Sequence, residues 1–271
     1  MPATDAAAPP SRQLLMMEVR AILELQAFFA MAPLLRLAPA GDGHPVMVLP
    51  GLSASDRSTA PLRAFLRDRG WRAHGWKLGA NHGPRPGVEQ AMQERLAELH
   101  RRHERKVSLV GWSLGGVFAR EMARRAPDHV RTVITLGSPF AGEPRASNAW
   151  KLYEAVSGRK VGDWPARELM RSPPPVPTTA IFSRTDGIVA WQGCLEREGP
   201  YAENIEVEGS HCGLGHNPVV LYAIADRLAQ PEGRWTGFDR SGLRRLIYPD
   251  PRRDVRGRAN DPHTKREGDG A

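Results

Sequence analysis

The sequence predicts an α/β fold in which helices cover both faces of a mostly parallel β-sheet. From residue 41 onwards, short apolar runs alternate with longer runs in which apolar residues recur at helical spacing. The first of the short runs, PVMVL at residues 45–49, is wholly apolar, as expected for a strand that is buried on both faces. With 271 residues, 41% of them hydrophobic, the chain is long enough for one large domain.

The predicted elements follow one another regularly along most of the chain. Strands are expected at residues 45–49, 71–77, 106–110, 131–136, 178–182 and 204–207, and helices at residues 58–69, 88–105, 114–125 and 217–230. The regularity lapses in residues 140–177, which predict an insertion of short helices. These elements form one domain over residues 41–248. Residues 1–12 and 249–271 lack apolar periodicity and are expected to be disordered.

Residues 13–40 precede this domain and predict an amphipathic helix, which Pro33 kinks or ends. Two interpretations stay open. The helix packs on the domain, or it forms a flap over an apolar site or contacts a membrane surface.

The N-terminal region lacks the pattern of a secretory signal, because Glu18, Arg20 and Glu24 interrupt its apolar residues. Its longest uncharged run is also shorter than the ~20 residues needed to span a bilayer. A cytoplasmic location is therefore favoured.

The formal net charge of +8 does not indicate nucleic-acid binding, because Lys and Arg are interspersed with Glu along helix-like segments. No phosphate-binding glycine loop is present. His211, Cys212 and His216 are close in sequence but too few to predict a zinc site. We therefore expect no cofactor, no metal and no nucleic-acid partner.

The stretch VGWSLGG, residues 110–116, lies between a predicted strand and a predicted helix. A sharp strand-to-helix elbow at this place would present the hydroxyl of Ser113 above the carboxyl ends of a parallel sheet. The flanking glycines fit such an elbow, which tolerates no bulky neighbours. Ser113 is therefore the candidate nucleophile. Its rivals Ser108, Ser138 and Ser183 have no such context.

A serine hydroxyl needs a base to take its proton, and that base needs a carboxylate to orient it. Asp186 follows the strand at residues 178–182, and His211 follows the strand at residues 204–207, so these are the candidate acid and base. The rivals are His216 for the base and Asp163 or Glu208 for the acid. His44 and His82 lie in loops rich in Gly or Pro and are expected at the surface or at a pocket rim.

With these motifs, residues 45–230 resemble the α/β-hydrolase superfamily, near its bacterial lipases and esterases. The resemblance implies a doubly wound, mostly parallel sheet with a helical cap, and ester hydrolysis through an acyl-enzyme. The HGGG motif of one subgroup is absent, and the first strand ends in PGLSAS instead. The backbone N–H groups of Leu52 and Leu114 are therefore the candidate oxyanion hole.

Cys194 follows the acid loop and Cys212 adjoins His211. Similar lipases carry a disulfide between these loops, so the resemblance suggests a Cys194–Cys212 bond, with two separate thiols as the alternative. Such a bond would favour an oxidising compartment, against the cytoplasmic location favoured above.

The tryptophans of the insertion, Trp150 and Trp164, are suited to line an apolar acyl pocket or simply to pack the insertion onto the domain. We expect hydrolysis of short- to medium-chain esters. An acyltransferase or a thioesterase is the alternative, because both use the same triad.

Overall fold

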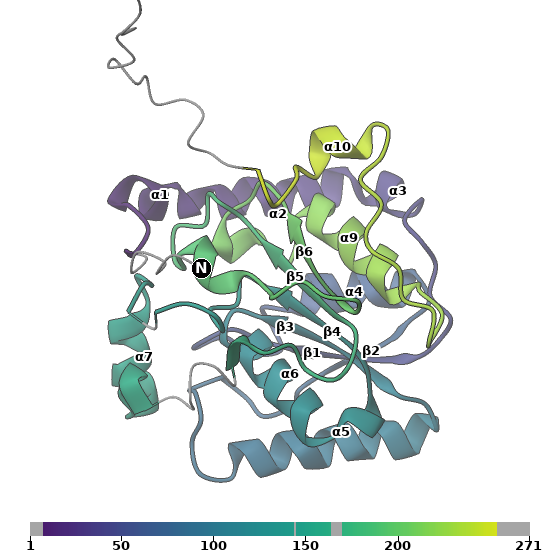
Figure 1. Ribbon diagram of the computed structural model, residues 1–271, viewed down its shortest axis with the longest axis horizontal. Coiled ribbons are helices and arrows are strands. Elements are labelled where there is room, and N and C mark those ends of the chain that lie inside the picture. Colours follow the sequence, from purple (N-terminus) through teal and green to yellow (C-terminus); the bar gives the residue numbers. More distant parts are fainter. Residues whose placement is uncertain (1–7, 144, 164–169, 254–271) are drawn as a thin grey trace, which may run out of the picture.

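Six parallel strands form the centre of the computed structural model, which describes residues 8–143, 145–163 and 170–253. Their order across the sheet is β2-β1-β3-β4-β5-β6, with β1 in the interior although it comes first in the chain (Figure 1). The strands are β1 (Pro45–Leu49), β2 (Arg72–Gly75), β3 (Val107–Trp112), β4 (Val130–Leu136), β5 (Thr178–Phe182) and β6 (Ala202–Glu206). Every pairing is parallel, so the carboxyl ends of all strands meet at one edge.

Helices connect the strands and cover the sheet. The α-helices are α1 (Arg12–Met16), α2 (Ala21–Ala30), α3 (Ala32–Leu35), α4 (Ala60–Asp68), α5 (Val88–His103), α6 (Leu114–Arg125), α7 (Trp150–Ser157), α9 (Pro218–Leu228) and α10 (Arg244–Ile247). The 3₁₀ turns are η1 (Met17–Arg20), η2 (Pro127–His129), η3 (Val161–Asp163), η4 (Trp191–Cys194) and η5 (His211–Gly213). None of the helices in the described ranges is long and apolar enough to cross a bilayer.

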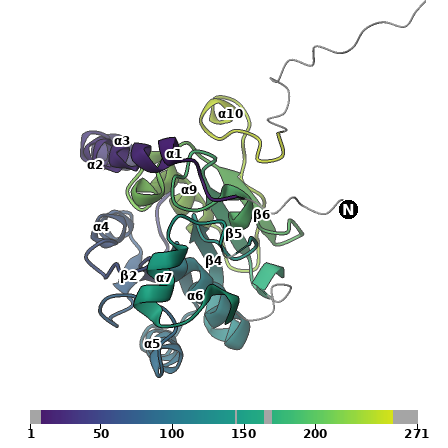
Figure 2. The ribbon, with the colours of Figure 1, turned by 90° about the vertical axis from the view of Figure 1, so that its left-hand side faces the viewer.

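The sheet separates two hydrophobic cores, because neighbouring side chains of a strand point to opposite faces. Val46 and Val48 of β1 pack with α4 and α9, whereas Met47 and Leu49 pack with α5 and α6. Figures 1 and 2 show these two helical layers on either side of the sheet.

The N-terminal segment, residues 12–38, forms a further layer outside α9 (Figures 1 and 2). It is not one kinked helix but the succession α1, η1, α2 and α3, and it breaks at Met31, before Pro33. Ser11 caps its start by accepting a hydrogen bond from the backbone N–H of Leu14 (3.3 Å).

The predicted elements agree well with the structure. The bounds of β1, α6 and β5 are as predicted, whereas β3 begins one residue later than predicted and ends two residues later, at Trp112. The short helix α10 was not expected from the sequence. Most residues expected to be disordered, and Trp164 of the insertion, lie outside the described ranges.

The predicted insertion contains α7 and η3 and is tied to α6 by Arg120. This buried guanidinium donates to the carbonyls of Met170 (3.0 Å) and Ser172 (2.9 Å) and forms an ion pair with Glu196. All of these partners follow α7 in the sequence. Arg120 therefore holds the segment in which the chain returns from the insertion to the sheet.

Candidate active site

Ser113 occupies the turn between β3 and α6, with φ 53° and ψ −123°. A positive φ is strained for a residue with a side chain, and such strain is retained at functional sites. The turn is fixed by the backbone N–H of Ser113, which donates to the carbonyl of Leu136 (2.8 Å). Gly111 is required on the strand side, because a Cβ there would overlap with the backbone of Gly115 and Gly116. The elbow predicted from VGWSLGG is therefore present.

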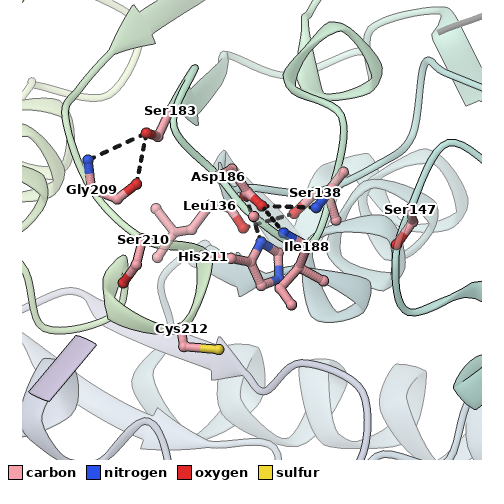
Figure 3. A network of polar contacts seen from close by, with 12 residues as sticks. Leu136, Ser138, Ser147, Ser183, Asp186, Ile188, Gly209, Ser210, His211 and Cys212 are labelled. Carbon is pink, nitrogen blue, oxygen red and sulfur yellow. Dashed lines mark hydrogen bonds and ion pairs between the residues drawn. The ribbon is translucent and has the colours of Figure 1, made fainter. Parts of the chain in front are cut away.

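His211 and Asp186 meet at the carboxyl edge of the sheet. His211 Nδ1 donates to Asp186 Oδ2 over 2.6 Å, and both side chains are almost fully buried (Figure 3). The other oxygen, Oδ1, accepts from the backbone N–H groups of Ile188 (2.8 Å) and Val189 (2.7 Å). Asp186 is thus held by its own loop, and it leaves Nε2 of His211 without a carboxylate partner and available as a base.

The electrostatics at His211 favour its protonated form. Burial lowers the pKa of the imidazole, but the charge and hydrogen bond of Asp186, together with the charge of Glu18, outweigh it. The pKa of His211 is therefore raised above its ordinary value. This environment stabilises the imidazolium that forms when the ring takes up a proton.

Gly137, which follows β4, lies against the Asp186–His211 pair. Its φ of +53° is strained for any other residue, and a Cβ would lie 3.0 Å from His211 Nδ1 and 3.1 Å from Asp186 Oδ2. The turn after β4 therefore needs glycine so that the acid and the base can approach each other.

Ser113 and His211 line one cavity of about 280 Å³, together with Leu52, Leu152 and Ile188. A smaller cavity of about 60 Å³ also reaches Ser113 and is lined by both Leu52 and Leu114. Ser113 Oγ makes no hydrogen bond within the described residues, and such bonds are often completed only when substrate binds. The structure thus brings the predicted nucleophile, base and oxyanion-hole residues to one place.

The turn that carries Leu52 is held by Asn81, which the sequence did not single out. The buried amide of Asn81 donates to the carbonyl of Pro50 (2.8 Å), and its backbone carbonyl accepts from the N–H of Ser53 (2.7 Å). Ser53 has a φ of 57°, so this turn is strained like the elbow.

The N-terminal segment also contributes to the site, through charged residues that the sequence analysis treated only as interruptions of an apolar run. The carboxylate of Glu18 accepts backbone N–H groups from Gly187 (2.8 Å), His211 (2.9 Å) and Cys212 (2.8 Å). One side chain therefore binds both the acid loop and the histidine loop. Burial raises the pKa of Glu18, but these three hydrogen bonds outweigh it and the pKa is lowered.

Arg20 also binds both loops, and Glu24 binds the histidine loop. Arg20 donates to the carbonyls of Thr185 (2.6 Å) in the acid loop and Gly209 (2.9 Å) in the histidine loop. Glu24 accepts from the N–H (2.8 Å) and hydroxyl (2.5 Å) of Ser210. Together with Glu18 they hold the two loops from outside the sheet.

Two further contacts join the loops that carry the site. Ser183, a rival nucleophile in the sequence, donates to the carbonyl of Gly209 (2.7 Å) and accepts from its N–H (3.3 Å; Figure 3). Trp112, next to Ser113, donates from Nε1 to the carbonyl of His211 (3.0 Å). His216, the rival base, donates instead to the carbonyl of Ala21 in α2 (3.0 Å).

The disulfide suggested by the resemblance is absent, because Cys194 and Cys212 are both free thiols. Cys194 is buried among Phe182 and Val189, whereas Cys212 is exposed beside the cavity. Burial and the charge of Glu18 raise the pKa of Cys212 to about 12. The hydrogen bonds of Glu18, Arg20 and Ser183 link the loops instead of a covalent bond.

A second Asp–His–Ser arrangement lies at the amino edge of the sheet. His44 Nδ1 pairs with Asp42, and His44 Nε2 lies 2.8 Å from Ser108 Oγ. His44 and Ser108 are fully buried, so the expectation that His44 lies at the surface or a rim is wrong. Burial and the charge of Arg131 lower the pKa of His44 to about 4. Because Ser108 has no access to solvent, this arrangement is structural.

Comparisons with known proteins bear on the fold and on the class of reaction. A family model described as palmitoyl protein thioesterase matches residues 45–170. Pimeloyl-(acyl-carrier protein) methyl ester esterase of Shewanella woodyi is 25% identical over 120 residues, which are 44% of this chain and 46% of that protein. The match thus spans less than half of the curated relative.

Solved structures match over a larger share of the chain. Lipase BlEst2 of Bacillus licheniformis is 17% identical, with a TM-score of 0.53 over 70% of this chain and 94% of that one. A pyrethroid hydrolase of Sphingobium faniae is 21% identical, with a TM-score of 0.51 over 69% and 98%. Aspergillus fumigatus lipase B, 17% identical, gives a TM-score of 0.54 over 69% of this chain and 52% of its own length.

The chain has the α/β-hydrolase fold. The resemblance seen in the sequence is therefore confirmed for the fold. In the α/β-hydrolase fold the elbow after β3, the loop after β5 and the loop after β6 lie together at the carboxyl edge, which is where Ser113, Asp186 and His211 are found. No group of three or more residues suited to hold a metal ion occurs among the described residues.

Proposed function

We propose that this protein hydrolyses carboxylic esters, with Ser113 as nucleophile, His211 as general base and Asp186 as the carboxylate that orients the base. The observation that carries the proposal is the 2.6 Å hydrogen bond between His211 and Asp186 beside a cavity that Ser113 and His211 line together. The esterases and lipases among the similar proteins support the same reaction class.

In the proposed mechanism, Ser113 Oγ attacks the ester carbonyl carbon while His211 Nε2 takes up the hydroxyl proton. The negative oxygen of the tetrahedral intermediate is stabilised by the backbone N–H groups of Leu52 and Leu114. The intermediate expels the alcohol, which receives the proton from His211 and leaves an acyl group on Ser113. Water then attacks the acyl-enzyme by the same steps and releases the carboxylic acid.

The cavities favour an apolar acyl group. The 60 Å³ cavity at Ser113 is lined by Leu114, Trp150 and Tyr153. Leu114 and Tyr153 also line a further cavity of about 210 Å³, which Phe118 and Met122 of α6 border. The two cavities share Leu114 and Tyr153, and the apolar side chains beside the nucleophile suit short- to medium-chain acyl groups, while charged residues such as Glu121 and Arg125 line part of the larger cavity.

A thioesterase is the second candidate, because the family model that matches residues 45–170 is that of a palmitoyl protein thioesterase. The same triad cleaves either bond, since only the leaving group differs. An acyltransferase would need an acceptor in place of water.

The test combines labelling with kinetics. A fluorophosphonate should label Ser113, and Ser113→Ala should lower kcat for nitrophenyl esters by about 10⁵-fold with the fold retained. Ser108→Ala is the matched control, because Ser108 also lies beside a histidine but has no access to substrate. Labelling elsewhere, or turnover by Ser113→Ala, would contradict the proposal. Paired oxygen esters and thioesters of equal acyl length decide between the two candidates.

A further inference from the structure

The outward face of the N-terminal segment is apolar, although an ordinary surface helix turns its apolar face inward. Val19, Ile22, Leu23 and Phe29 are each more than 60% exposed. Val19 is three and four residues before Ile22 and Leu23, and Phe29 is seven residues after Ile22, with the exposed Gln26 between them, so these side chains lie along one face of η1 and α2. We call this face the outer stripe; it consists of Leu15, Met16, Val19, Ile22, Leu23, Phe29, Leu34 and Leu37, all exposed.

The opposite face carries the charges. Between Arg12 and Arg36 the only charged residues in the sequence are Glu18, Arg20 and Glu24. All three are partly buried and bind backbone groups of the acid loop or the histidine loop. The outer stripe is thus free of charge along its length, with the exposed Arg12 and Arg36 at its two ends.

We infer that the outer stripe is a docking surface for an anionic lipid surface. A row of exposed apolar side chains along one face of a helical segment is typical of an interaction site. Lipid fits it because apolar side chains enter the acyl region while Arg12 and Arg36, at the ends, reach the phosphates of the headgroups. The stripe has no acidic side chain that would repel such a surface, and the chain as a whole carries a net charge of +8.

A second copy of the chain fits the stripe less well. A twofold contact pairs the two stripes in antiparallel fashion, which brings Arg12 of one copy towards Arg36 of the other. Parallel pairing brings each arginine towards its own equivalent. In both arrangements like charges meet and no carboxylate on the stripe compensates them.

Docking would also place the cavity close to the lipid. Cys212 lines the cavity, and its backbone N–H is bound by Glu18 on the inner face of the same segment. The segment therefore joins the lipid contact directly to the loops of the site. This consequence for catalysis rests on the proposed ester hydrolysis, whereas the docking itself does not.

The test measures binding without turnover, in a Ser113→Ala background, by co-sedimentation with vesicles of equal parts phosphatidylcholine and phosphatidylglycerol. Ile22→Glu with Leu23→Glu should lower the partition coefficient about tenfold or more. The reason is that two charged side chains replace apolar side chains that the lipid would bury on docking. Arg102→Glu is the matched control, since it changes the net charge by the same amount on α5, in the opposite helical layer. Circular dichroism and the unfolding midpoint establish that the variants fold.

The inference is overturned if the unsubstituted stripe does not bind these vesicles, or if the double variant binds as well as the control. It is also overturned if gel filtration shows a dimer that the double variant abolishes, because a second copy is then the occupant. Hydrolysis of a soluble nitrophenyl ester by the protein with Ser113 intact tests the proposed function separately, so that failure of one is distinguishable from failure of the other.

Discussion

Replacing Glu18 by Gln tests whether the N-terminal segment positions the catalytic loops. Oε1 accepts the N–H groups of Gly187 and His211, and Oε2 accepts that of Cys212. A glutamine amide has one oxygen, so at least one of these hydrogen bonds is lost and the others lose a charged acceptor. Hydrogen bonds to charged groups contribute roughly 1.5–3 kcal/mol each. Since Glu18 is only partly buried, we expect a loss of about 2 kcal/mol of unfolding free energy.

The same substitution should alter the pH profile. The charge of Glu18 adds to that of Asp186 in raising the pKa of His211. Without this charge the pKa of His211 falls, so the neutral base is present at lower pH and the acidic limb of kcat/KM moves to lower pH. At the plateau kcat should fall on the order of tenfold, because the histidine loop is less well positioned. KM for a small ester should change little, since Glu18 does not line the cavity.

The assay is the initial rate of hydrolysis of a soluble nitrophenyl ester across pH, with unfolding in denaturant measured on the same preparations. Glu94→Gln is the control, because Glu94 is exposed on α5 and accepts a hydrogen bond from Gln90 of the same helix, far from the two loops. A Glu18→Gln protein with an unchanged acidic limb and an unchanged kcat would refute the positioning role.

Three further predictions concern the elbow and the buried histidine. Trp112→Phe removes the hydrogen bond to the His211 carbonyl, so stability should fall by about 1 kcal/mol and kcat should fall with it; equal kcat would contradict this. Gly111→Ala should lower the denaturant midpoint by the equivalent of about 2 kcal/mol, because its Cβ overlaps with the backbone of Gly116. The pKa of His44 is lowered to about 4, so its contribution to stability is lost as pH falls from about 6.5 to about 4. At about 1.4 kcal/mol per pKa unit this is about 3 kcal/mol, and unfolding of His44→Asn should depend less on pH.

The fold and the candidate catalytic residues could be predicted because their signals are local in the sequence. Ser113 lies between glycines, directly after an apolar strand and before a helix. Asp186 and His211 each follow a strand, and parallel strands bring their carboxyl ends to one edge. Chain order and periodicity alone therefore place the three residues together.

The contacts between the N-terminal segment and the loops of Asp186 and His211 could not be predicted, because they join residues that are far apart in the sequence. Glu18 and Arg20 bind loops that are 165 or more residues away, and nothing near them in the sequence indicates these partners. The suggestion of a Cys194–Cys212 disulfide was wrong because position in the sequence does not show where a side chain points. Cys194 follows the loop of Asp186 and Cys212 adjoins His211 in sequence, but the Cys194 side chain is buried in a core and Cys212 is exposed.

The arrangement of Asp42, His44 and Ser108 has a consequence for recognising enzymes by their side-chain geometry. Within the described residues, a carboxylate and an imidazole pair near a serine at each edge of the sheet, and the contact between imidazole and hydroxyl is made at His44 and Ser108. The two arrangements differ in the burial and the charge of the groups around the histidine. Arginine charge and complete burial keep His44 neutral, whereas carboxylate charge and an adjoining cavity prepare His211 to accept a proton. The same three types of side chain are therefore proposed to carry out catalysis at the carboxyl edge, whereas at the amino edge they hold buried strands together.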